Sequence, residues 1–200
     1  MFVQVMQGKV KDEAGLRKQW ERWSQEIKPQ AQGYLGGTGG VTPDGEFILL
    51  ARFENAEAAK TNSDRPEQGA WWEETSQYVS DVMFHDCTEV DLLDNGGSDD
   101  AGFVQVIQGK VTDVARSREL DARMEPQMKE ARPDVIGGIT AWHPENGRFT
   151  SALYFTSETE ARAKEKDMES SEGFEEFMAE YQEISDGEPK YMDLPDPLMN

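Results

Sequence analysis

A nine-residue segment occurs twice in this chain. Residues 2–10 read FVQVMQGKV and residues 103–111 read FVQVIQGKV, so eight of nine positions are identical at a spacing of 101 residues. This spacing is half of the 200-residue chain, whereas solenoid repeats recur about every 20–50 residues. The sequence therefore predicts one domain written twice, with a first unit over residues 1–94, a linker over 95–101 and a second unit over 102–200.

The chain carries a large excess of acidic residues. It has 40 Asp and Glu against 20 Lys and Arg, a net charge of −20. A surface of this sign repels nucleic-acid phosphates and anionic membranes, so we expect neither as a partner. The sequence has no apolar run long enough to span a membrane and no signal-peptide pattern at its start. Cys87 is the only cysteine, which excludes an internal disulfide. Together these features predict a soluble cytoplasmic protein.

Apolar periodicity predicts the order β-α-β-β-α-β in the first unit. Residues 3–10 form a predicted strand, and Asp12 is a candidate N-cap for a helix that runs to about residue 29. Two further strands are expected from residue 34 and over 47–53, joined by a turn at Pro43-Asp44-Gly45. A second helical region begins after Asn55 and restarts at Pro66. An extended run over 82–93 is predicted to close the unit. The apolar stripe of the first helix consists of Leu16, Trp20, Trp23 and Ile27.

The second unit repeats this order. A helix is expected from about Asp113 to before Pro133, a hairpin turn at Asn146-Gly147, a helix cap at Ser157 and a last strand over 190–194. The tail at 195–197 contains two prolines and cannot extend a central strand. The order β-α-β-β-α-β is that of a ferredoxin-like unit, in which an antiparallel sheet carries both helices on one face. The other face needs a cover.

The combined pattern resembles a known family. The repeated strand, the helix after it, the pair Gly36-Gly37 matched by Gly137-Gly138, and the acidic, Ala-rich start of the second helical region are similar to the antibiotic biosynthesis monooxygenases of the dimeric α/β-barrel superfamily. The similarity covers both units. It implies an α+β fold in which two tandem ferredoxin-like units pack sheet to sheet as an intramolecular barrel. The chain would then be a monomer with an internal pseudo-dimer, or a homodimer of it.

The resemblance also implies an activity and a site. The superfamily includes oxygenases of aromatic polyketides that use no cofactor, and in such a mechanism the substrate itself would supply electrons to oxygen. We therefore expect no cofactor and a small aromatic or apolar molecule as the partner. The first unit offers Trp71 and Trp72 as a substrate-binding wall, Gln4 or Gln7 as an orienting amide, and His85 as a candidate base. Adjacent helical positions point about 100° apart, so we expect one tryptophan to pack in the core and the other to line a cleft.

Two other site types are disfavoured by their surroundings. The glycines at 36–40 are followed by a strand and a turn, whereas a phosphate loop leads directly into a helix. His85 and Cys87 supply only two of the three or four ligands that zinc requires, so we expect no metal site and a core role for Cys87. The repeated glutamines, Gln4 and Gln7 with Gln105 and Gln108, also fit a shared structural role.

Two alternative functions stay open. The first is a non-catalytic protein that binds small molecules or partners on the same fold. The second is haem binding or haem degradation. Haem-degrading members of the superfamily use an Asn on the first strand, a Trp on the second helix and a His. This chain has Gln4 and Gln7 on that strand and no Asn, so we expect no tight binding of haem.

Overall fold

The computed structural model describes residues 1–94, 96–145, 147–169 and 173–200. The chain divides into two compact units. The first contains Met1–Val90 together with Asp196–Asn200, and the second contains Asp91–Pro195. The predicted boundaries differ from these because a short segment from each half belongs to the other half's unit. Asn95 of the predicted linker and Asn146 of the predicted turn lie outside the described residues.

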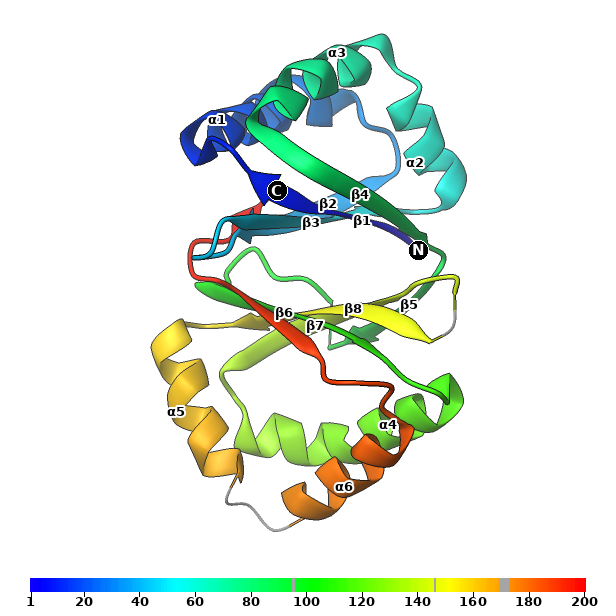
Figure 1. The fold of residues 1–200 in the computed structure, drawn as a ribbon, viewed down its shortest axis with the longest axis vertical. Helices are drawn as coiled ribbons and strands as arrows, with labels where there is room; N and C mark the ends of the chain where they lie inside the picture. The colour runs from blue at the N-terminus through cyan, green and yellow to red at the C-terminus, as the bar shows by residue number, and fades with distance from the viewer. Residues whose placement is uncertain (95, 146, 170–172) are drawn as a thin grey trace. The chain divides into compact units, whose positions relative to one another are not determined.

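The first unit has the predicted order of strands and helices. Its helices α1, α2 and α3 lie on one face of the sheet (Figure 1). The predicted caps are confirmed, since the Asp12 carboxylate accepts a hydrogen bond from the Gly15 amide at 3.0 Å and Asn55 accepts one from the Ala58 amide at 2.9 Å. The elements are β1 (Phe2–Val10), α1 (Glu13–Arg22), a π-helical turn (Trp23–Ile27), a 3-10 turn (Lys28–Gln30), β2 (Tyr34–Val41), β3 (Glu46–Phe53), α2 (Ala56–Ser63), α3 (Pro66–Thr75), a 3-10 turn (Ser76–Tyr78) and β4 (Val79–Cys87).

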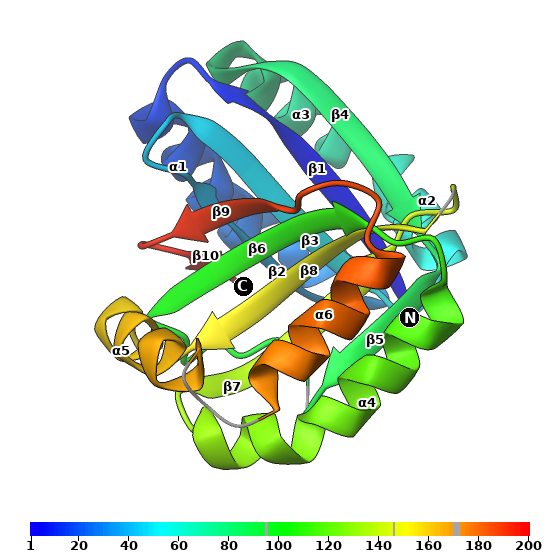
Figure 2. The same cartoon turned by 60° about the horizontal axis from the view of Figure 1, so that its bottom comes forward.

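The second unit repeats this plan with longer helices. Figure 2 shows α4 and α6 side by side, and in the sheet β6 lies beside β8. The predicted Ser157 cap is confirmed, since its hydroxyl accepts a hydrogen bond from the Glu160 amide at 3.3 Å, and Asp113 caps α4 by accepting one from the Arg116 amide at 2.9 Å. The elements are β6 (Phe103–Lys110), α4 (Val114–Ala131), β7 (Val135–Trp142), β8 (Arg148–Phe155), α5 (Glu158–Glu169), α6 (Phe174–Ile184) and β9 (Lys190–Leu194).

Each sheet has five strands, so the predicted four-stranded sheets are one strand short. The strand orders are β10-β2-β3-β1-β4 and β5-β7-β8-β6-β9. The extended run predicted to close the first unit is in fact two strands. β4 ends at Cys87, and β5 (Glu89–Leu93) joins the second sheet. In return β10 (Leu198–Met199) pairs with β2 in the first sheet. The tail does not extend β9, but it supplies this extra edge strand.

The two exchanged strands carry the same short motif. Residues 91–95 read DLLDN and residues 196–200 read DPLMN. Each aspartate of the motif pairs with an arginine on the first helix of the unit that it joins. Arg17 binds Asp196 at 2.9 Å and Arg118 binds Asp91 at 2.7 Å. Arg17 and Arg118 are themselves 101 residues apart, so the sequence repeat includes the exchanged strands.

The fold class predicted from the sequence is confirmed as two tandem ferredoxin-like units of α+β type. The sheet-to-sheet packing of a barrel stays a prediction. Among the described helices, none combines the length and the apolar character needed to cross a membrane.

Candidate small-molecule site

A small apolar cavity lies in the first unit, between the helix-bearing face of the sheet and helices α1 and α3. Its volume is about 30 Å³, enough for about two water molecules. Every side chain in its wall is apolar except Thr75 and the indole nitrogens of the tryptophans. The wall consists of Met6, Leu16, Trp20, Gly39, Gly40, Val41, Phe47, Ile48, Leu49, Trp71, Trp72, Thr75, Val79 and Leu198.

Glycines of β2 and a residue of β10 shape one side of this cavity. Gly39 pairs with Leu49 on β3 and with Leu198 on β10. A Cβ atom on Gly39 would lie only 2.8 Å from the Ile48 carbonyl oxygen, closer than real Cβ contacts, so a side chain here would have to displace backbone. Strand β2 therefore contributes bare backbone to the wall, and Leu198 contributes an apolar side chain from the far end of the described chain.

Both tryptophans of α3 lie in the cavity wall. We expected one in the core and one at a cleft, and the two instead differ only in how deeply they are buried. Trp71 is only 4% exposed, and its indole N–H donates to the Gln19 carbonyl oxygen at 2.8 Å. Trp72 is only partly buried, and its ring meets Phe84 edge to face with the ring centroids 5.4 Å apart. Of the two α3 indoles, that of Trp71 is buried and hydrogen-bonded, and that of Trp72 is partly exposed.

The structure does not bring His85 to this cavity. On β4 the ring of Phe84 packs on Trp72, and Phe84 pairs with Met6 of the cavity wall. His85 pairs with Val5, and successive residues of a strand point to opposite faces. His85 therefore lies on the sheet face opposite to the cavity. Gln7, one position after Met6, lies on that opposite face as well.

Gln4 shares the helix-bearing face with Met6 but does not line the cavity. Its side-chain amide donates to the Asp86 carboxylate at 2.9 Å. The matching residue of the second unit, Gln105, donates to Asp193 at 3.0 Å. The same bond at the same place in both units supports the structural interpretation of this repeated glutamine, since only the first unit's copy lies near the cavity described here.

Cys87 is completely buried. Burial raises the pKa of its thiol from 9.0 to about 12, and the nearby Asp86 carboxylate adds to the shift. A thiol of this kind stays protonated at neutral pH, which makes it a weak nucleophile and a weak metal ligand. Within the described residues no group of three or more His, Cys, Asp or Glu side chains could hold a metal ion.

Positions in the second unit that match the cavity wall carry larger or polar side chains. Thr140, Ala141 and Trp142 of β7 stand 101 residues after Gly39, Gly40 and Val41. The Thr140 hydroxyl donates to Ser151 at 3.0 Å. Trp142 is buried in a cluster with Val111 and Phe149. Side chains thus fill the space that the glycines of β2 leave open in the first unit.

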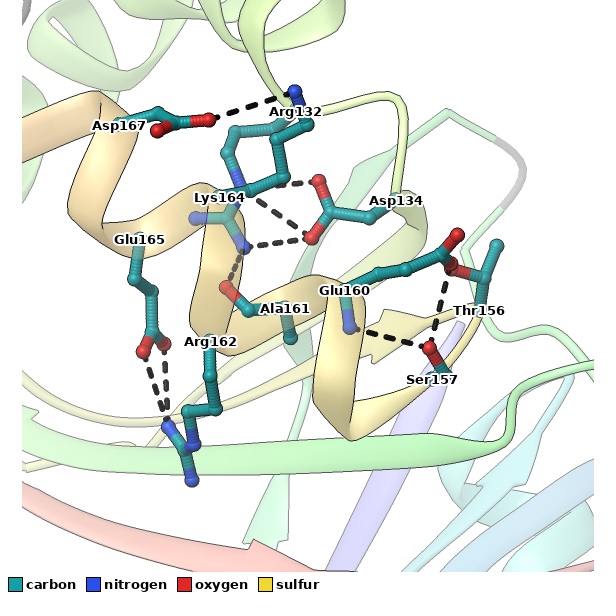
Figure 3. A network of polar contacts seen from close by, with 10 residues as sticks. All are labelled: Arg132, Asp134, Thr156, Ser157, Glu160, Ala161, Arg162, Lys164, Glu165 and Asp167. Carbon is teal, nitrogen blue, oxygen red and sulfur yellow. Dashed lines mark hydrogen bonds and ion pairs between the residues drawn. The ribbon is translucent and has the colours of Figure 1, made fainter.

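The second unit also buries an ion pair (Figure 3). Arg132 and Asp134 follow α4, and their side chains are 7% and 3% exposed at a separation of 2.8 Å. Arg132 also donates to the Ala161 carbonyl oxygen at 3.5 Å and lies over the Phe155 ring, 5.5 Å from its centroid. These bonds join the end of α4 to α5, and they give this part of the unit a polar interior.

Of the wall residues, the sequence marks only Trp71 and Trp72 as site residues, and Trp20, Gly39 and Leu198 are among those that it misses. In the sequence, Trp20 belongs to the core stripe of the first helix, Gly39 lies in the glycine-rich segment 36–40, and Leu198 follows a tail at 195–197 that cannot extend a central strand. The repeated D-x-L-x-N motif is a signal that could have placed Leu198 beside the glycines of β2. Nothing in the local sequence distinguishes Trp20 from its neighbours on the same stripe.

Comparison with solved structures places the fold among monooxygenase-like proteins. No protein-family model and no curated protein matches the sequence. A protein of Fusobacterium nucleatum subsp. nucleatum ATCC 25586, described as a proposed monooxygenase, has a TM-score of 0.74 at 10% identity, with 96% of this chain and 90% of that chain covered. The fold is shared along the whole chain. An anthrone oxidase-like protein matches with a TM-score of 0.67 at 11% identity, over 99% of this chain and 92% of that one.

A shorter protein matches half of this chain. It comes from Caulobacter crescentus CB15 and is described as a proposed antibiotic biosynthesis monooxygenase. It covers 45% of this chain and 90% of its own length, at 15% identity and a TM-score of 0.41. At the level of the fold, the two whole-chain matches confirm the predicted resemblance of this tandem chain to monooxygenase-like proteins. At these identities the likeness concerns the fold alone.

Proposed function

We propose that this protein binds a small aromatic or apolar molecule in the cavity of its first unit and oxidises it with molecular oxygen without a cofactor. The observation that carries the proposal is the apolar wall itself, with two adjacent tryptophans on α3 facing the helix-bearing side of the sheet. Ligand sites in proteins are mostly apolar hollows with few polar groups. The fold shared with an anthrone oxidase-like protein supports the reaction type.

The chemistry would be the conversion of an activated ring CH2 group to a carbonyl. One molecule of oxygen is consumed, one oxygen atom enters the product and the other leaves as water with the two hydrogens. The substrate supplies the electrons, so the protein's part is to bind, orient and exclude water. Aromatic wall residues such as Trp71 and Trp72 suit this role, because a ring held in one orientation reacts with less loss of entropy.

The cavity must adapt to hold a whole ring. Its volume of about 30 Å³ is far below the roughly 300–1,000 Å³ of ordinary ligand pockets. Trp72 on α3 and Leu198 on β10 are only partly buried, as is Trp20 on α1. They are the side chains whose displacement would enlarge the space, and we propose that the ligand enters past them.

Oxygen uptake with anthrone as the probe tests this proposal. Wild-type protein is expected to accelerate oxygen consumption and quinone formation in a one-to-one ratio, and Trp72→Ala is expected to reduce both by at least tenfold. Trp142→Phe, a substitution in the core of the second unit, is the matched control and should leave the rate unchanged. Oxygen consumption equal to that of buffer alone would exclude the oxidase function.

A non-catalytic binding protein is the second candidate, and one observation favours it. None of the residues that line the cavity is titratable, so the wall offers no general base for proton removal. Saturable quenching of tryptophan fluorescence by anthrone without oxygen uptake would support this alternative. For haem the expectation of no tight binding is unchanged, and an absorbance titration without a saturable Soret shift would agree with it.

A further inference from the structure

Trp20 lies in the cavity wall, and its indole nitrogen is an unusual polar atom of the first unit. It is buried, and no acceptor for its N–H group lies among the described residues. Three other indoles of the chain are paired, those of Trp23, Trp71 and Trp142. The Trp23 N–H donates to Gln68 at 2.7 Å, and Trp71 donates to the Gln19 carbonyl oxygen. In folded proteins the great majority of buried donors have a partner, so this exception needs an explanation.

The wall offers Trp20 no partner, and it offers a water molecule few hydrogen bonds. Thr75, the other polar side chain of the wall, uses its hydroxyl proton on the Trp71 carbonyl oxygen at 2.8 Å. Buried waters typically make about three hydrogen bonds to protein groups, and this cavity is lined almost wholly by carbon. A water molecule beside Trp20 would therefore leave most of its own hydrogen bonds unmade.

The repeat shows that the fold itself does not require an indole at this position. Asp12 and Asp113 cap the equivalent helices in the two units, and the same offset of 101 residues relates Trp20 to Asp121. Leu16, which precedes Trp20 by one turn in the cavity wall, corresponds to Ser117. The buried N–H group thus belongs to the unit that has the cavity.

We propose that Trp20 positions the ligand by donating its indole N–H to an oxygen acceptor on an otherwise apolar molecule. This inference rests on the proposed function, and it adds a requirement to it: the ligand carries a carbonyl or comparable acceptor oxygen. An acceptor on the ligand satisfies the buried donor, whereas a hydrocarbon of the same shape leaves it unpaired. The cavity therefore discriminates between molecules that differ by one oxygen atom.

A matched pair of probes tests the inference. 1-Indanone and indane have the same two rings and differ in one carbonyl group. Binding is followed by fluorescence quenching and by the indole N–H signals in 1H–15N spectra, each assigned from its loss in a single Trp→Phe variant. We expect 1-indanone to bind about fivefold more tightly than indane, as for one net neutral hydrogen bond. The Trp20 proton signal should move downfield with 1-indanone only.

The variants separate the two proposals. Trp20→Phe should remove the preference for 1-indanone and keep binding of indane, while the control Trp23→Phe should keep the preference, because that N–H group already has Gln68 as acceptor. Equal binding of both probes to wild-type protein would overturn the role of Trp20 and leave the proposed function standing. Binding of neither probe would overturn both. If Trp20→Phe does not fold, the Trp20 signal is identified by elimination from the other four variants, and the wild-type titration decides.

Discussion

The two units share a sequence repeat, the same helix caps and the same order of elements, yet they differ in what lies between helices and sheet. The first unit places glycines on β2 and tryptophans on α1 and α3, and a small apolar cavity results. The second unit places Thr140, Ala141 and Trp142 at the matching strand positions and buries the ion pair of Arg132 and Asp134. Two units with the same fold can therefore have different interiors, because the side chains at a few strand positions decide whether a cavity remains between helices and sheet.

The largest expected effect concerns the ion pair of the second unit. Removing one partner of a buried pair leaves an uncompensated charge, so Asp134→Ala should lower the free energy of unfolding by about 3–5 kcal/mol. Chemical denaturation measures this change. The control is Asp64→Ala, which breaks an exposed pair with Lys60 whose side chains are 73% and 63% exposed, and it should cost less than about 1 kcal/mol. Equal costs for both variants would show that the interior of the second unit is not polar in the way described.

The next effect concerns the tryptophans of the first unit. Trp71→Ala removes a buried ring and its hydrogen bond to Gln19, and should lower the free energy of unfolding by about 3–5 kcal/mol. Trp72→Ala removes a partly exposed ring and should cost about 1 kcal/mol. Denaturation midpoints of the two variants measure the asymmetry. If both variants lose stability equally, both rings belong to the packed core. That result would contradict the assignment of the cavity as a binding site.

A third prediction concerns Cys87, whose place in the second unit is taken by Leu194, since Val3 pairs with Cys87 and Val104 with Leu194. The pKa of its thiol is raised to about 12 in the folded state. The unfolded chain loses this proton first as pH rises, so the thiol's contribution to stability is present below pH 9 and decreases between pH 9 and about 12. The difference in unfolding free energy between wild type and Cys87→Ala should shrink over this interval.

Labelling provides an independent check on that thiol. Iodoacetamide should modify Cys87 at pH 8 only after denaturant unfolds the chain, because the folded thiol is both buried and protonated. Rapid labelling of the folded protein would contradict the burial found here.

The smallest expected effect concerns Asp121, the counterpart of Trp20. Burial raises the pKa of its carboxyl group from 3.8 to about 6, and the nearby Asp91 carboxylate adds to the shift. A raised folded pKa means that the stability associated with this group is present at low pH and is lost as pH rises through that range. Because neighbouring atoms crowd the carboxyl group but the residue as a whole is exposed to solvent, the change should be small. Asp121→Asn should flatten the pH dependence of the denaturation midpoint between pH 4 and 6, and an unchanged profile would contradict the shift.

Much of the fold follows from local sequence signals. Asp12, Asn55 and Asp113 each cap the predicted helix, and Pro66 begins α3 as expected. These features depend on side chains within three or four residues of the backbone group that they satisfy. The exchange of β5 and β10 was missed because strand pairing joins residues far apart in the sequence, and an apolar run such as 82–93 does not reveal which sheet it joins.

The candidate site was predictable only in part. Trp71 and Trp72 were identified because adjacent tryptophans on one helix are rare enough to stand out. His85, Gln4 and Gln7 are predicted from residue type alone. The sheet face on which each side chain lies depends on the register of its strand, and a shift of one residue moves the side chain to the opposite face. The bulge of β4 against β1, where Asp81 adopts a φ of 53°, changes this parity again between Gln7 and Lys9. No single-residue pattern in the sequence predicts such a shift.

The exchange of edge strands also affects how the protein assembles during synthesis. The cavity wall includes Leu198, which lies near residues of the first half of the chain. Asn200, two residues later, accepts a hydrogen bond from the Tyr34 hydroxyl across 166 residues. Contacts so distant in sequence form late, because the intervening chain must first be ordered. The ribosome will have released nearly all of the second unit before the first sheet gains its fifth strand. A nascent first unit therefore exposes an unfinished apolar hollow until the segment that carries Leu198 has been made.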